Sequence, residues 1–180
     1  LFFDRHVKFF TDGAFFSELM QLNEPGYIDG HHGEWLTPPE QFEAITRAYW
    51  NEGYRIHVHC TGDLGLELAR DVLEKLQFER PRVDHRFTIE HFGASNEDQV
   101  RRMKALGALV SANVYYLHEL GEAYWRKSIG HERASQMARL KFTCSEFFLK
   151  ERSCCAECIY EHCVHECTYK IDRNGFGAVC

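Results

Sequence analysis

Two histidines in one short apolar run are the first residues of this sequence whose types and spacing could do chemistry. The run is "RIHVHC" at 55–60, and Thr-Gly-Asp follows it. Residues two apart in a strand project to the same face, so His57 and His59 would share one face of a sheet. Two imidazoles on one face can share a metal ion, or one can be a ligand and the other a bystander. A hydrogen-bonded core histidine without further function is the alternative for each.

Four apolar segments have the length and the polar boundaries of β-strands. They cover residues 6–10, 55–60, 86–91 and 108–114. Helical periodicity covers residues 38–52, 64–76, 95–106 and 122–140. Thr37 is the expected N-cap of the first helix, and Ser95 with Asp98 is the expected cap of the third.

The alternation of strands and helices with short connections is typical of parallel βαβ units. In such α/β folds the chemistry gathers at the carboxyl ends of the strands. Asp12, His59 and His91 all fall at or just after such ends. The sequence therefore predicts one site to which several consecutive strands contribute.

Three motifs together resemble the metal-dependent amidohydrolase superfamily, and within it the YtcJ-like branch, also called amidohydrolase family 3. They are "VKFFTDGA" at 7–14, "HVHCTGD" at 57–63 and "FTIEHFG" at 87–93, in this order, and "GALVSANV" follows at 107–114. The resemblance covers about residues 5–139. It implies an α/β fold that is part of a (β/α)8 TIM barrel, whose middle strands supply metal ligands.

The resemblance also implies a ligand set, in which Lys8 is carbamylated and His59 and His91 are the next two ligands. The metal would be divalent, with zinc the expected ion, and a complete site would hold one or two ions. A carbamate turns an ammonium that repels cations into an anionic oxygen ligand. His57 would then be a packed or supporting neighbour, and Glu90 is expected to face the helices, paired with an arginine.

Further candidates surround these residues, and each has a plain alternative. Asp12 would shape the loop after the lysine strand, or orient a ligand or substrate. Asp63 would cap the helix that begins at residue 64, with a supporting role at the site as the alternative. His31 and His32 lie in a Gly-rich loop that would overhang the site or simply be exposed. Tyr115, together with Tyr116 and His118, would line a substrate pocket or lie on the surface.

The implied function is hydrolysis of an amide or another non-peptide C–N bond in a small molecule by a metal-activated water. The resemblance starts at what looks like the family's fourth strand, so the His-x-His ligand pair of the family's first strand has no counterpart here, and nothing after residue 140 resembles the last strand with its aspartate, the general base. We therefore expect a fragment of such an enzyme that is inactive alone. The alternative is a non-catalytic remnant or a metal-binding module.

Composition separates the chain into residues 1–140 and a Cys-rich tail at 141–180. Seven of the eight cysteines lie in the tail, including Cys155 and Cys158. A small zinc knot, foreign sequence without evolved function, and a disulfide cluster are the three interpretations of the tail. The net charge of -6 offers no basic patch for nucleic acid. The absence of a long apolar run predicts no membrane span and a cytoplasmic protein, with the oligomeric state left open.

Overall fold

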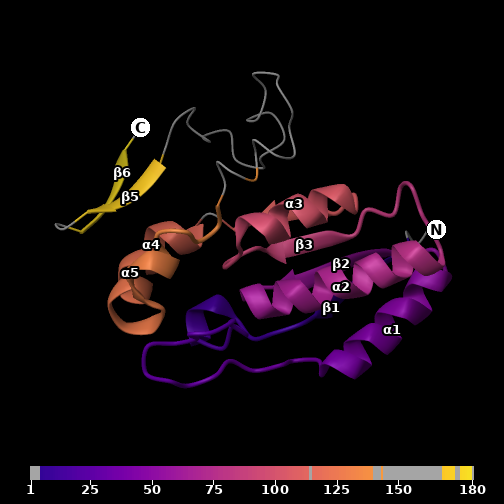
Figure 1. The fold of residues 1–180 in the computed structure, drawn as a ribbon, viewed down its shortest axis with the longest axis horizontal. Helices are drawn as coiled ribbons and strands as arrows, with labels where there is room; N and C mark the ends of the chain where they lie inside the picture. The colour runs from indigo at the N-terminus through magenta and orange to yellow at the C-terminus, as the bar shows by residue number, and fades with distance from the viewer. Residues whose placement is uncertain (1–4, 114, 140–142, 144–167, 173–174, 180) are drawn as a thin grey trace.

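A parallel four-stranded sheet forms the centre of the chain (Figure 1). The structure, a computed structural model, describes residues 5–113, 115–139, 143, 168–172 and 175–179. The strands lie side by side in chain order: β1 (His6–Phe10), β2 (Arg55–Cys60), β3 (Thr88–His91) and β4 (Leu109–Ala112). Three helices connect them: α1 (Pro39–Asn51), α2 (Asp63–Glu79) and α3 (Glu97–Ala105). This arrangement confirms the predicted α/β fold and corresponds to part of a (β/α)8 barrel.

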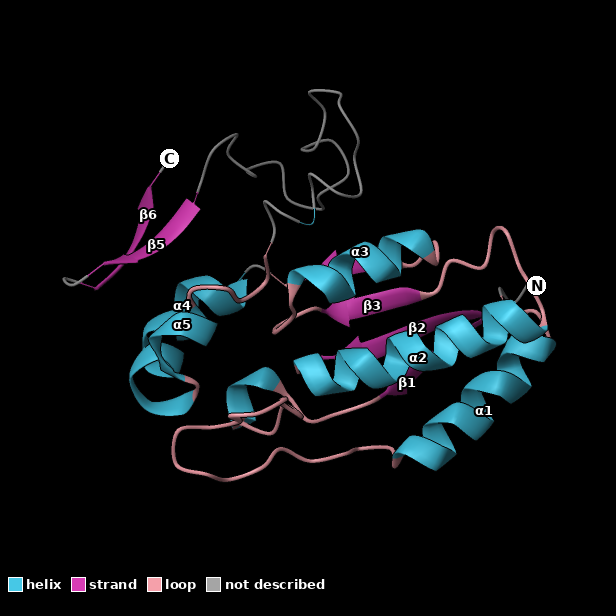
Figure 2. Cartoon of the chain, in the orientation of Figure 1, coloured by secondary structure: helices cyan, strands magenta, loops and turns pink. Residues whose placement is uncertain are grey.

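The three connecting helices lie on one face of the sheet, as Figure 2 shows. Every second strand residue points toward them, because side chains alternate along a strand. Ile56, Val58 and Ile89 are at most 1% exposed on this face. They pack against apolar side chains of the helices, which are Phe42, Trp50, Leu66, Ala69, Val72, Leu73, Leu76, Val100 and Met103. The period-two pattern that predicted the strands thus also forms the main core.

The helix starts differ by one or two residues from the predicted ones. α1 has Pro38 as its N-cap residue, without a side-chain cap, so the prediction of Thr37 was wrong. In α3 the cap is Asn96 rather than Ser95, and Asn96 with Gln99 forms a complete capping box. The run Ser-Asn-Glu-Asp offers adjacent residues that can cap, and the structure uses the one whose third successor is glutamine.

The segment after β4, predicted to be mostly helical over residues 122–140, consists of several short helical pieces. α4 (Tyr115–Ala123) passes into a π-helical turn, η2 (Tyr124–Ser128), and α5 (Gly130–Ala134) follows. Gly130 has a φ of 77°, a left-handed conformation that interrupts the helix and that glycine adopts without steric cost. In Figure 1, α4 and α5 lie beyond the carboxyl ends of the strands.

A second apolar cluster fills the space between these helices and the loops after the strands. Its fully buried centre is Phe15, from the short 3-10 helix η1 (Phe15–Ser17), with Met20, Tyr27 and Tyr124 around it. The cluster fixes the loops that surround the carboxyl ends of β1, β2 and β3. The main core therefore stabilises the packing of the helices on the sheet. The second cluster stabilises the loops at the carboxyl ends of the strands, where chemistry is expected.

Two short strands in the tail, β5 (Thr168–Asp172) and β6 (Gly175–Val179), pair in antiparallel fashion. The Cys and His residues at 144–167, on which the three interpretations of the tail depend, lie outside the described residues. The division of the chain at residue 140 therefore stays a prediction. Within the part of the chain that the structure describes, no helix has both the length and the apolar character of a membrane span.

Candidate metal centre

The strand register brings the polar strand residues to the face of the sheet opposite the helices, which we call the open face. Lys8 on β1 pairs with His57 on β2, and His59 on β2 pairs with Glu90 on β3. Paired residues of neighbouring strands project to the same side. Lys8, Phe10, His57, His59 and Glu90 therefore form one continuous polar and aromatic surface. Helix packing buries the alternate residues of the same strands.

His59 and His91 lie together at the carboxyl end of this face. Their ring centroids are 4.6 Å apart with the rings at 63°, and His59 is only 7% exposed. Strict alternation would put Glu90 and His91 on opposite faces, but His91 has a φ of 72°. This left-handed conformation is rare for residues other than glycine. It turns the chain at the end of β3, where the His91 ring meets His59. Such strain often marks functional positions.

The surroundings of both imidazoles keep them uncharged. Burial, followed by the neighbouring His91, lowers the pKa of His59 to about 4. Burial also lowers the pKa of His91, and the positive charge of Lys8 is the next cause. The same lysine charge contributes to the lowered pKa of His59. Neutral imidazoles keep the lone pair that a metal ion needs, so both rings are in the form that can coordinate.

The partly exposed Lys8 side chain ends at a carboxylate on the open face. Its Nζ forms an ion pair with Oε2 of Glu90, and Nδ1 of His57 lies 2.7 Å from Oε1 of the same carboxylate. Burial opposes the ionisation of Glu90, but the hydrogen bonds from Lys8 and His57 hold its pKa below the ordinary value. The expectation that Glu90 faces the helices beside an arginine was therefore wrong. His57 supports Glu90, which in turn holds Lys8.

Asp12 joins three loops behind the site. It is fully buried, and its oxygens accept hydrogen bonds from the backbone N–H groups of Gln21, Thr61 and Gly62 at 2.7–3.0 Å. The hydroxyls of Thr11 and Thr61 donate to it as well. A Cβ added to Gly62 would lie 2.0 Å from the carbonyl oxygen of Gln21. This close approach explains the Thr-Gly pair after β2, because only glycine fits there.

Burial raises the pKa of Asp12 to about 6, although the hydrogen bonds from Thr61, Gln21 and Gly62 act in the opposite direction. All five hydrogen bonds to this carboxylate come from the three loops themselves. Asp12 therefore acts on the site by fixing the chain that follows the Lys8 and His59 strands. Of the two interpretations made from the sequence, loop shaping agrees with these contacts.

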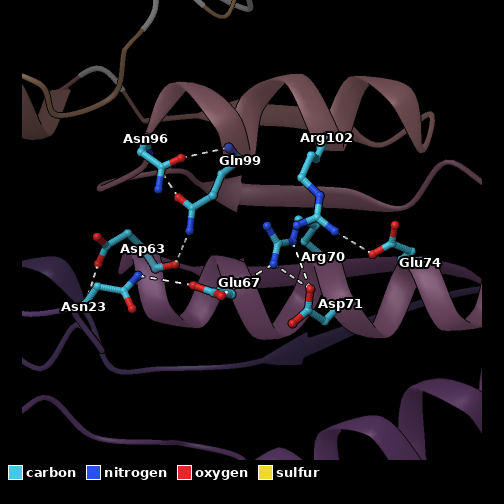
Figure 3. A network of polar contacts seen from close by, with 9 residues as sticks. All are labelled: Asn23, Asp63, Glu67, Arg70, Asp71, Glu74, Asn96, Gln99 and Arg102. Atoms are coloured by element: carbon cyan, nitrogen blue, oxygen red, sulfur yellow. Dashed lines mark hydrogen bonds and ion pairs between the residues drawn. The ribbon is translucent and has the colours of Figure 1, made fainter.

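Asp63 is the first residue of α2, and Gly62 is its N-cap residue, so the prediction that Asp63 caps the helix was off by one position. Its Oδ1 accepts a hydrogen bond from the backbone of Asn23 at 2.9 Å, and its Oδ2 forms an ion pair with Arg133 of α5 at 2.8 Å. Figure 3 shows Gln99 reaching from α3 to the Asp63 carbonyl at 2.8 Å. Asp63 thus ties the second apolar cluster to the helix layer.

The Gly-rich loop holds its two histidines differently. Nδ1 of His31 lies 2.6 Å from Asp29, Nε2 lies 2.8 Å from the Glu18 carbonyl, and the ring stacks on Tyr27 at 3.9 Å. These contacts, the one with the Glu18 carbonyl first, raise the pKa of His31. His32 is exposed. His31 therefore braces the loop, and its ring does not join His59 and His91.

Two tyrosines, Tyr115 and Tyr116, follow β4 at the start of α4. The backbone of Tyr115 opens α4, but its side chain lies outside the described residues, so its predicted role in a substrate pocket stays a prediction. The hydroxyl of Tyr116 lies 3.4 Å from Nδ1 of His91. This contact was not foreseen from the sequence, which gave only the position of Tyr116 after a strand end.

One surface depression of about 410 Å³ lies away from the candidate centre. It is lined by Arg82, His85, Lys104 and neighbouring residues at the opposite end of the strands. In the described ranges, no three His, Cys, Asp or Glu side chains converge in the way that would hold a metal ion. The candidate centre is therefore two imidazoles and a lysine on an open surface.

A parallel sheet with helices on one face, and with imidazoles at the carboxyl ends of its strands, is typical of the α/β-barrel fold class. Within that class, the model of the "Amidohydrolase family" matches residues 2–144. The chain belongs to this family, as the three motifs predicted. The match does not single out the YtcJ-like branch.

Two solved structures are similar to the chain. Both are crystal structures of uncharacterized metal-dependent hydrolases, one from Pyrococcus furiosus and one from Pyrococcus horikoshii OT3. The first is 27% identical with a TM-score of 0.65 over 77% of this chain, and the second is 27% identical with a TM-score of 0.64 over 76%. The chain spans only 28% and 27% of their lengths. No curated protein matches the chain significantly in sequence.

Proposed function

We propose that Lys8, His59 and His91 form one side of a divalent-metal centre in a hydrolase that acts on non-peptide C–N bonds of small molecules. The observation that carries this proposal is the meeting of the buried His59 and the half-buried His91, both neutral, at the carboxyl ends of β2 and β3, with Lys8 of the neighbouring β1 on the same side of the sheet. Family membership and the two metal-dependent hydrolases of similar fold support the same conclusion.

The donor set suits such an ion in its chemistry. Imidazole nitrogen is a preferred ligand of zinc, and an anionic oxygen from a carbamylated Lys8 would add a third donor. The lysine in its charged form would repel the ion, which is consistent with its effect on the pKa values of both histidines. Zinc fits this nitrogen-rich set better than magnesium or calcium, which prefer oxygen ligands.

A metal ion bound here would supply a water of lowered pKa and would polarise a carbonyl group. The residues of the chain have the supporting roles. Burial keeps His59 and His91 uncharged, and Glu90 with His57 fixes the direction of the Lys8 side chain. Asp12 fixes the loops that follow the Lys8 and His59 strands.

The proposal includes the expectation that the chain alone hydrolyses amides slowly or not at all. The described residues supply Lys8, His59 and His91 and no aspartate in the position of the family's general base. A general acid or base contributes roughly 10²- to 10⁴-fold to a rate, so its absence alone would leave little activity. Hydrolysis of N-acyl substrates by the purified chain, abolished by a chelator, would contradict this expectation.

Cobalt(II) binding to the full-length chain tests the metal centre. Cobalt is used because cysteine ligands give an intense sulfur-to-metal charge-transfer band, whereas nitrogen and oxygen ligands give only weak d–d bands. Binding at the proposed centre is therefore distinguishable from binding by tail cysteines. We expect the wild-type chain to give a d–d signal without the sulfur band. His59→Ala and His91→Ala should each lower the affinity for this cobalt ion by at least about tenfold.

His131→Ala is the matched control, because His131 is an exposed histidine on α5, away from the candidate centre, whose ring lies at 74° to that of Trp125 with centroids 5.5 Å apart. This variant should bind cobalt like the wild type. The proposal fails if the His59 and His91 variants retain the wild-type d–d signal and affinity. It also fails if all cobalt bound by the chain shows the sulfur band.

A further inference from the structure

We propose that Tyr116 is a positioning residue for His91, accepting a hydrogen bond from the Nδ1–H group so that the Nε2 lone pair is the one left for a ligand. The use of that lone pair for a metal ion rests on the proposed function. The choice of tautomer by Tyr116 does not, because the contact belongs to the chain itself.

The contact joins two consecutive parts of the fold. The Tyr116 hydroxyl lies 3.4 Å from Nδ1 of His91, and the two ring centroids are 6.0 Å apart at 29°. β4 pairs His91 with Ala112, and the N–H of Asn113 donates to the His91 carbonyl at 3.0 Å. The backbone thus anchors Asn113 beside His91, three residues before Tyr116.

Phe15 holds the tyrosine ring in place from the other side. The rings of Phe15 and Tyr116 are stacked with centroids 4.6 Å apart and an interplanar angle of 7°. Phe15 is fully buried and also stacks on Tyr124 at 4.2 Å. A Cβ on Gly93 would lie 2.9 Å from Cδ2 of Phe15, so the glycine leaves room for this ring. The hydroxyl of Tyr116 is therefore directed by a rigid aromatic stack.

Only one of the two neutral tautomers of His91 leaves the Nε2 lone pair available to a ligand. A neutral imidazole carries a proton on one nitrogen and a lone pair on the other. If Nδ1 carries the proton, it donates to the Tyr116 oxygen, and Nε2 is the acceptor. If Tyr116 donates instead, Nε2 carries the proton and has no lone pair. Partners of this kind orient metal-binding histidines and set their tautomer in many proteins.

Tyr116 has a matched control in the same stack. Tyr124 packs on the same Phe15 ring and is 3% exposed, and among the described residues its hydroxyl makes no side-chain hydrogen bond of the kind that joins Tyr116 to His91. Tyr116→Phe and Tyr124→Phe each remove one hydroxyl and retain the aromatic ring. A purely structural role of the stack predicts similar effects of the two substitutions, whereas a positioning role predicts an effect at His91 for the first alone.

The experiment is two-bond ¹⁵N–¹H NMR of the full-length, metal-free chain with ¹⁵N-labelled histidine at about pH 8, where ordinary imidazoles are neutral. The His91 signals are assigned by their loss in His91→Ala. We expect the Nδ1–H tautomer to dominate in the wild type and in Tyr124→Phe, and to lose at least half of its population in Tyr116→Phe. An Nε2–H tautomer in the wild type, or unchanged populations in Tyr116→Phe, overturns the inference.

Cobalt titration of the same variants separates this inference from the proposed function. Tyr116→Phe should bind cobalt about tenfold more weakly, and Tyr124→Phe should match the wild type. A tautomer change in Tyr116→Phe without cobalt binding by any variant would refute the metal centre and retain the positioning role. If cobalt binding depends on His91 but the tautomer populations of His91 are unchanged in Tyr116→Phe, the positioning role alone is refuted.

Discussion

The two faces of the same four strands differ in almost every property. On the helix-covered face, Ile56, Val58 and Ile89 are buried among apolar side chains. On the open face, the alternate positions carry Lys8 and Glu90, partly exposed and paired with each other. One backbone thus serves stability on one side and chemistry on the other. The period of two residues along each strand makes this separation possible.

At the carboxyl end of the sheet, part of the open face is also buried. His59 belongs to the open face but is only 7% exposed, because the rings of Phe10 and His91 and the carbonyl of Gly13 lie against it. His91 joins it through a backbone conformation that ordinary alternation does not provide. At this end of the sheet, burial and the positive charge of Lys8 both contribute to the lowered pKa values of His59 and His91.

Substitutions that empty the helix-covered face should have the largest effect on stability. Ile89→Ala removes a side chain that is 1% exposed and should lower the free energy of unfolding by about 2–5 kcal/mol. Phe10→Ala on the open face removes a larger side chain that is 41% exposed, and should cost about 1 kcal/mol or less. Urea denaturation of both variants measures the contrast. Equal losses would show that the open face is packed as tightly as the other.

Asp12→Asn should have the next largest effect. The amide retains one acceptor oxygen and replaces the other with a donor, which leaves buried N–H groups without partners. A loss of about 1–3 kcal/mol in the free energy of unfolding is expected at pH 5. Asp84→Asn is the control, because Asp84 is exposed and forms its ion pair with the nearby Arg86. If both variants unfold at the same urea concentration, the three loops do not depend on Asp12.

The same substitution should change how stability depends on pH. The folded-state pKa of Asp12 is about 6, above its ordinary value of 3.8, so the folded protein binds the proton more tightly than the unfolded chain. Its contribution is complete below about pH 4 and is lost as the pH rises through 6, by at most about 3 kcal/mol. The difference in unfolding free energy between wild type and Asp12→Asn should therefore shrink from pH 4 to 7. A difference that grows over this range would contradict the role of burial.

Glu90→Gln tests the open face with a smaller effect. The carboxylate stabilises the Lys8 ammonium and would repel a carbamate, so it opposes the reaction of the Lys8 amine with CO₂, which forms an N–C bond and releases a proton. The variant should reach half-carbamylation at an about two- to fivefold lower bicarbonate concentration, measured by ¹³C NMR with labelled bicarbonate. Glu40→Gln, at an exposed position in α1, should leave it unchanged. A higher bicarbonate requirement in Glu90→Gln would show that the carboxylate assists the modification.

The smallest effect is expected in the Gly-rich loop. Contacts with Glu18 and Asp29 raise the pKa of His31, so its stabilising contribution is present at low pH and is lost as the pH rises through the folded-state pKa. His31→Ala should therefore lower the thermal midpoint by a few degrees at pH 5 and by less at pH 8. His32→Ala should leave the midpoint unchanged at both values. Equal shifts of the thermal midpoint in the two variants would contradict a stabilising role for the contacts of His31.

The elements of the fold were predictable from sequence because they depend on local periodicity. All four strands and the three helices between them follow from apolar spacing, and the motifs located His59 and His91 at strand ends. The helix starts were less predictable, because adjacent residues such as Ser95 and Asn96 can both cap a helix. Local spacing contains no preference between them, and the capping box with Gln99 decides.

The arrangement of the site depended on features that alternation does not contain. The open-face position of Glu90 required the strand register and the turn at His91, which has a left-handed conformation. The contact of Tyr116 with His91 required the aromatic stack on Phe15, a residue about one hundred positions away in sequence. The sequence could therefore identify the histidines and the lysine, but not the residues that orient them.

Anomalous diffraction from crystals of the chain grown with zinc and bicarbonate tests the central claim most directly. The account predicts an anomalous peak about 2.0–2.1 Å from a ring nitrogen of both His59 and His91, the usual zinc–imidazole distance. Density for a carbamate on Lys8 should reach the same peak. Zinc found elsewhere on the chain, with His59 and His91 left without a peak between them, would contradict the assignment of a metal centre to this end of the sheet.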